Sequence, residues 1–138
     1  MDKLIKELAS NQDHITLILW ATVCAEHVLA IFEEKYPDDD RPRKAVEAAR
    51  AWARGELAVS GARAAAFAAH AAARNVNTAA ACAAARAAGH AAAAAHVAGH
   101  AVHAAAYAAK AAGYAGAAAE AKEREWQYRY LVELGNKP

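Results

Sequence analysis

The chain lacks the short motifs that most often mark an enzyme active site. It has no glycine-rich phosphate loop, no Gly-x-Ser-x-Gly motif and no His-Glu-x-x-His motif. It also has no acidic residue between Glu56 and Glu120. Its two cysteines, Cys24 and Cys82, form no Cys-x-x-Cys motif, and Cys24 with His27 does not indicate a nucleophile pair. The sequence therefore predicts a protein that is not an enzyme and that holds no cofactor.

Charge and hydropathy give no sign of nucleic-acid or membrane binding. The formal net charge is +1, and the basic residues are too few and too spread for a nucleic-acid site. The first ten residues contain acids and no apolar core, so we expect no signal peptide. The apolar run at 15–23 is interrupted by Glu26 and His27 before it could span a bilayer. We therefore expect a cytoplasmic protein with reduced cysteines.

Alanine is the residue that the chain has in excess. It occupies 36 of the 60 positions from 62 to 121, and 46 of all 138. Alanine is the best helix former, and its small side chain lets helix axes approach closely. No segment shows the two-residue alternation of a strand. The sequence therefore predicts an all-α fold in a single domain, residues 1–138.

Capping residues, glycines and prolines predict where the helices begin and end. The segment 13–35 is apolar nearly all round, which is typical of a buried helix, and Tyr36-Pro37 ends it. We expect a compact array of six to seven helices, arranged as stacked hairpins around this segment. Gly99 either breaks the chain or only bends it. The expected helices are 2–9, 13–35, one from Asp39 or Asp40 to Arg54, 61–75, 78–95, a sixth that follows Gly99 and runs to about 112, and 117–134.

Large residues recur at helical spacing within the alanine-rich half. Spacings of three and four residues place each set on one face of its helix, pointing at a neighbouring helix, a groove or water. The sets are Arg63, Phe67, His70 and Arg74; Cys82, Arg86 and His90; and His100, His103, Tyr107, Lys110 and Tyr114. One candidate binding site is a polar groove of His70, Arg74, His96, His100, His103 and Tyr107.

Three histidines, His96, His100 and His103, are spaced so that an unbroken helix would present them on one face. Three imidazoles in that arrangement would suit zinc or another transition metal. A break at Gly99 would separate His96 from the others, and no carboxylate is near them in the sequence. We expect no metal here; the alternative is a protein that binds a metal or small ligand through these histidines.

Glu26 lies within the most apolar segment of the chain. Burying an unpaired carboxylate is costly, so we expect Glu26 to form a structural ion pair. Arg50, Arg63 or Arg86 could be the partner.

The turn after 13–35 holds the densest group of like charges. As a solvated loop it would also cap the next helix, and as a binding surface it would attract a basic protein. We take it as the leading partner-binding surface. Its residues are Glu33, Glu34, Asp38, Asp39 and Asp40.

Several segments, in this order, together resemble an alanine-rich group of bacterial immunity proteins linked to polymorphic-toxin systems. The resemblance covers roughly residues 20–112. Ala98 departs from the pattern, which has proline before Gly99-His100. The segments are Cys24–Leu29, Asp39–Arg43, Glu47–Trp52, Arg63–Arg74, Arg86–His90, His96–His100 and Tyr107–Lys110.

What the resemblance implies is an all-helical cytoplasmic protein that binds and neutralises a cognate toxin without catalysis. Its partner would be that protein toxin, with no role for nucleic acid or membrane. The alternatives from other classes are a metal- or small-ligand-binding protein that uses the histidines, and an oligomeric scaffold.

Overall fold

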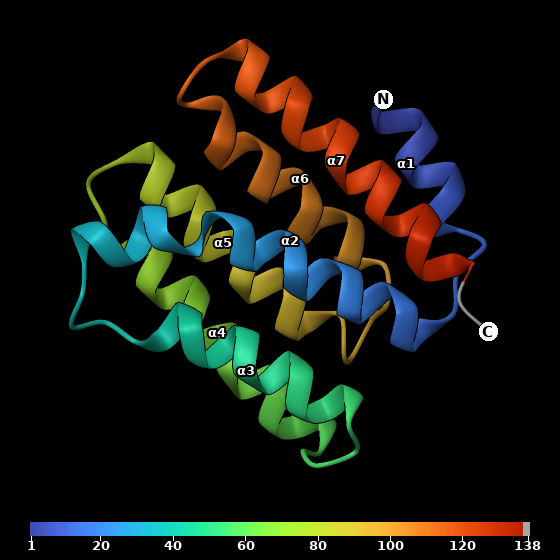
Figure 1. The fold of residues 1–138 in the computed structure, drawn as a ribbon. Helices are drawn as coiled ribbons and strands as arrows, with labels where there is room; N and C mark the ends of the chain where they lie inside the picture. Colours follow the sequence, from blue (N-terminus) through green and yellow to red (C-terminus); the bar gives the residue numbers. More distant parts are fainter. Residues whose placement is uncertain (137–138) are drawn as a thin grey trace.

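The computed structural model describes residues 1–136, which form seven helices joined by short turns (Figure 1). Within these residues there is no strand. The prediction of an all-α array of six to seven helices is confirmed. The helices are α1 (Asp2–Ala9), α2 (His14–Lys35), α3 (Arg41–Ala53), α4 (Val59–Arg74), α5 (Ala79–Ala93), α6 (His100–Gly113) and α7 (Ala117–Gly135).

Local sequence explains several of the helix ends. The carboxylate of Asp13 accepts a hydrogen bond from the Thr16 backbone N–H at 2.7 Å and caps α2. Thr78 caps α5 in the same way, with its hydroxyl 3.2 Å from the Ala81 nitrogen. The turns after α3 and α6 use Gly55 and Gly116, whose φ angles of 76° and 137° favour glycine.

The centre of the molecule is shared by α2 and α5. Helix α2 packs against α3, α5, α6 and α7, and α5 packs against α2, α3, α4 and α6. Nine of the fifteen residues of α5 are buried. The outer side of α2 is exposed, with Ile15 at 43% and Leu19 at 37%. The expectation that 13–35 is buried nearly all round is therefore wrong for its outer side, and the alanine-rich α5 is enclosed more completely.

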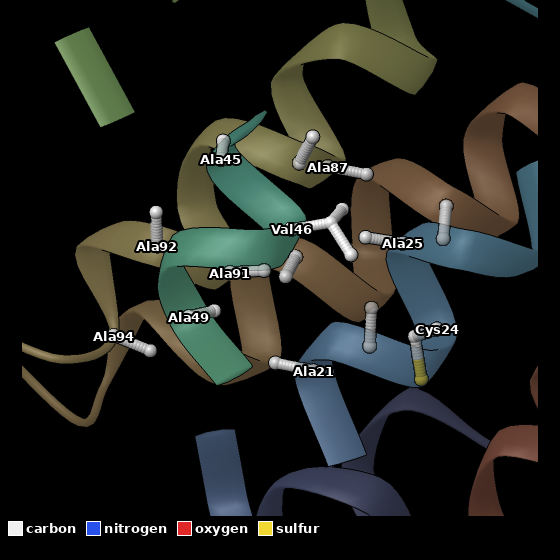
Figure 2. Packing of buried hydrophobic residues seen from close by; sticks show 14 of the residues in the cluster. Ala21, Cys24, Ala25, Ala45, Val46, Ala49, Ala87, Ala91, Ala92 and Ala94 are labelled. Atoms are coloured by element: carbon white, nitrogen blue, oxygen red, sulfur yellow. The ribbon is translucent and has the colours of Figure 1, made fainter. Parts of the chain in front are cut away.

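Small side chains allow this close packing. Figure 2 shows labelled core residues of α2, α3 and α5, nearly all of which are alanines, with Val46 and Cys24 as larger exceptions. Both cysteines are free; Cys24 is buried and Cys82 is half-buried. Burial raises the pKa of the Cys24 thiol well above its usual value, so this cysteine behaves as a small apolar core residue.

One helix among the described residues, α2, is long and apolar enough by length and composition to cross a membrane. In this fold, 56% of its most apolar window is buried. Its packing against four other helices accounts for that apolar composition.

A buried polar network ties α7 to the rest of the array. The fully buried Gln127 donates from its side-chain nitrogen to the Ala105 carbonyl at 2.8 Å, and its side-chain oxygen accepts from Arg124 at 2.8 Å. The indole N–H of Trp20 donates to the Gln127 carbonyl at 2.9 Å. Arg124 also donates to Asp2 at 2.9 Å. Helices α1, α2, α6 and α7 are thus joined through the side chain and backbone carbonyl of Gln127 and through the side chain of Arg124.

Candidate functional site

The histidines and arginines of the alanine-rich half lie on α4, α5 and α6 and in the turn between α5 and α6. Helix α5 lies between α4 and α6 and packs against both (Figure 1). Many alanines of these helices face inward, as at Ala66, Ala84 and Ala105, which are at most 4% exposed. The larger residues therefore point outward. We call this surface the histidine face; it consists of Arg63, Phe67, His70, Arg74, Arg86, His90, His96, His100, His103, Tyr107 and Lys110.

His90 of α5 is the centre of the histidine face. Its ring centroid lies 4.8 Å from that of His70, 5.2 Å from those of His100 and Tyr107, and 5.5 Å from that of His103. The Tyr107 ring is nearly parallel to it, with an interplanar angle of 10°. His90 therefore joins the side chains of α4 and α6 into one cluster.

Two hydrogen bonds fix the rings of the cluster. Arg86 donates from Nη1 to Nδ1 of His70 at 3.0 Å, which places the His70 proton on Nε2. Nδ1 of His90 lies 3.0 Å from Nδ1 of His100, so one of these nitrogens donates and the other accepts.

Gly89 makes room for this arrangement. A Cβ atom at this position would lie 2.7 Å from Cε1 and Nε2 of His70. Any larger residue would push His70 away from α5 and away from Arg86. The pair Gly89-His90 thus supplies the space for one imidazole and the ring that contacts it.

Burial keeps the cluster uncharged. Desolvation lowers the pKa of His90 to about 3 and that of His70 to about 4, and neighbouring positive charges, including Arg86, add to both effects. Burial also lowers the pKa of His100, with His103 and His96 contributing. At neutral pH these rings are neutral and present one N–H donor and one acceptor each.

We expect acid to destabilise the fold through these rings. Below about pH 6.5 histidines of the unfolded chain bind protons, while folded His70 and His90 do not until about pH 4 and 3. Stability should therefore fall as the pH drops from about 6.5 to about 4.5. His90→Gln should reduce the proton uptake on unfolding by about one, and His70→Gln/His90→Gln by about two, measured from urea unfolding at several pH values. An unchanged pH slope in the double variant would contradict this.

The possible metal triad His96, His100 and His103 is not formed. Helix α5 ends at Ala93, and His96 lies in the turn before α6. The helix is therefore already interrupted before Gly99. Among residues 1–136, no group of three or more histidines, cysteines and carboxylates could hold a metal ion. The sequence did not settle whether the helix was broken, and the structure resolves the question against a shared face.

The histidine face contains a cleft of about 210 Å³ between α4 and the start of α6. The polar side chains that line it are Arg63, His70, His96 and His100. Phe67 also lines it and is 65% exposed, which is unusual for so apolar a side chain. Larger hollows lie elsewhere, among them a cleft of about 690 Å³ beside His27 and Trp126.

The structure brings together most of the predicted polar groove. His70, His100, His103 and Tyr107 all contact His90, and His96 lines the cleft together with His70 and His100. Arg74 is exposed, and its charge contributes to the low pKa of His70. The predicted groove omits His90, its central member. The spacing of four residues from Arg86 to His90, which places both on one helix face, could have indicated that His90 belongs to the groove.

Glu26 pairs with Arg50, and each guanidinium nitrogen of the terminal fork donates to one carboxylate oxygen. The side chains of the pair are 32% and 36% exposed. The expectation of a buried carboxylate is therefore wrong, and a pair this exposed contributes on the order of 1 kcal/mol or less. Arg86 binds His70 instead, and Arg63 is exposed at the cleft.

The acidic turn is balanced by cations of the same segment. Arg43 pairs with Glu33 at 2.6 Å, Arg41 with Asp39 at 2.7 Å, and Lys44 with Asp40 at 3.4 Å. The guanidinium groups hold the pKa values of Glu33 and Asp39 below their usual range. Only Glu34 and Asp38, both exposed, are outside these ion pairs.

The protein is thus an all-helical array that carries a surface of histidines, arginines and aromatic residues. A sequence model of the family described as "Imm-5 like putative immunity protein" matches residues 7–134, nearly the whole chain. The chain belongs to this family, and the resemblance to immunity proteins is confirmed. No curated protein and no solved structure matches the chain.

Proposed function

We propose that the protein neutralises a cognate toxin by binding it, without catalysis, and that the histidine face makes the contact. Membership of the immunity family supports a role in protection. The observation that carries the choice of surface is the group of exposed and half-exposed aromatic, arginine and histidine side chains on a rigid alanine-packed base. Aromatic residues and arginine are the types enriched at protein–protein interfaces.

The chemistry of the face suits binding better than catalysis. A catalytic histidine usually needs a carboxylate or carbonyl that orients its ring and a nearby nucleophile. Here the hydrogen bonds of His70 and His90 go to Arg86 and His100. Positions 57–119 contain no Asp or Glu, so α4, α5 and α6 offer no carboxylate. The strongly lowered pKa values of His70 and His90 also leave them poor proton acceptors at neutral pH.

The rigidity of the base favours tight docking. The face rests on alanines that are fully buried between helices, such as Ala69, Ala88 and Ala104. Little side-chain ordering is needed when His70, His90 and His100 already hold one another in place. Association therefore loses less conformational entropy than it would on a loop. The acidic turn has no comparable cluster, and most of its charge is already paired.

A toxin encoded beside this gene would provide the test. Phe67→Ala should weaken binding of the purified toxin by roughly 10-fold to 100-fold, because exposed aromatic side chains are typical anchors of an interface. Protection of cells that express the toxin should fall in parallel. Leu4→Ala on α1 is the matched control, since Leu4 is also exposed, at 48%, but lies off the histidine face. Equal affinities for wild type and Phe67→Ala would exclude this surface.

A further inference from the structure

We infer that the toxin surface that meets the histidine face is acidic and places a carboxylate side chain in the cleft formed by Arg63, His70, His96 and His100. This inference rests on the proposed function and names the chemistry of its partner. If the acidic turn were the contact surface, the partner surface would instead be basic.

The first support is charge that the protein itself leaves unbalanced. Within residues 1–136, five of the nine arginines are in ion pairs, and three of the other four are Arg63, Arg74 and Arg86 on this face. No carboxylate lies on α4, α5 or α6 to balance them. Arg63, Arg74 and Lys110 are exposed. A surface with unpaired cations and no acid attracts a partner surface of negative charge.

The second support is the chemistry of the cleft. Because Nδ1 of His70 accepts from Arg86, the other ring nitrogen of His70 carries a hydrogen and can only donate. Arg63 offers a fixed fork of donors that matches the two oxygens of a carboxylate. A lysine or arginine from the partner would be repelled by the charge of Arg63. The exposed ring of Phe67, which also lines the cleft, would exclude water from such a pair.

The third support is size. A volume of about 210 Å³ is smaller than the roughly 300–1,000 Å³ typical of small-molecule sites. It suits one or two side chains of a partner protein. Nucleic acid fits less well, because only three exposed cations lie here, whereas DNA-binding sites commonly neutralise about 6–10 phosphates.

The test has one arm that needs no toxin. The labelled protein is titrated with hexaglutamate, hexalysine and single-stranded oligothymidine while its amide and imidazole NMR signals are followed. Hexaglutamate should shift signals of Arg63, Phe67, His70, His96 and His100 at millimolar concentration, and hexalysine should not. Arg63→Glu should remove the response, whereas Arg129→Glu on α7, an exposed arginine elsewhere, should keep it. No response to hexaglutamate at the cleft, or tighter binding of oligothymidine there, would overturn the inference.

The second arm uses the toxin. Its association rate with the wild type should fall as salt rises from about 50 to about 500 mM, because salt screens the attraction. Arg63→Glu/Arg74→Glu should slow association at low salt by about 10-fold or more and flatten that dependence, with Arg129→Glu within about 2-fold of wild type. If the Arg63→Glu/Arg74→Glu variant bound the toxin as tightly and as fast as the wild type, the inference would be overturned and the proposed function would stand. A toxin that fails to bind the wild type, while hexaglutamate still binds the cleft, would overturn the proposed function and leave the acidic-ligand site standing.

Discussion

Leucine in place of Ala84 or Ala105 should lower the free energy of unfolding by about 1–3 kcal/mol in each case. Both side chains are fully buried, Ala84 on α5 and Ala105 on α6, two helices that pack against each other. Helices that meet through single methyl groups have no space for three further carbon atoms. The additional atoms must force the helices apart or push side chains out of their preferred rotamers.

The neighbouring position supplies the control. Ala106 follows Ala105 on α6 but is exposed, so Ala106→Leu should change stability by less than about 0.5 kcal/mol. Chemical denaturation of the three variants, with circular dichroism to follow the helices, measures the difference. Equal stabilities would mean that the alanine faces are not helix contacts and that the packing described above is wrong.

Replacing Gln127 by alanine is expected to cost about 3 kcal/mol. The change removes the acceptor for Arg124 and the donor for the Ala105 carbonyl, and it leaves a cavity where the side chain was fully buried. Arg124 is only 8% exposed and would keep Asp2 as its remaining partner. The cost therefore comes from the cavity, from the Arg124 N–H that loses its acceptor and from the Ala105 carbonyl that loses its side-chain donor.

Gln12→Ala is the matched comparison, because Gln12 is half-buried and makes one local bond of 3.3 Å to the Leu8 carbonyl. Its loss should cost less than about 1 kcal/mol. Thermal and urea unfolding of both variants distinguishes the two cases. A Gln127→Ala protein as stable as Gln12→Ala would show that the network does not hold α7 in place.

The fold was predictable because its signals are local. Alanine content predicts helices wherever it occurs, and Tyr36-Pro37, Gly55 and Thr78 predict where they end or begin. The burial of α5 was harder to foresee than that of α2. A helix of alanines carries little apolar surface per residue, so its hydropathy does not distinguish a central position from an outer one.

The site was predictable only in part, because it depends on how neighbouring helices are rotated about their axes. Each set of large residues at helical spacing could be placed on one face of its own helix, and this brought His70, His100 and Tyr107 into one group. Helix packing decides which of these sets come into contact. In this structure the packing places His90 at the centre and Gly89 against His70. The density of carboxylates in the acidic turn likewise did not show that Arg43, ten residues after Glu33, pairs with it.

Chemical-shift mapping of the labelled protein with its toxin tests the central claim most directly. The account predicts that the largest changes on adding the toxin occur at Phe67, His70, His96, His100 and Tyr107, with little change from Glu33 to Asp40. The opposite pattern, with changes concentrated at Glu34 and Asp38 and the histidine signals unmoved, would contradict the account and identify the acidic turn as the contact surface.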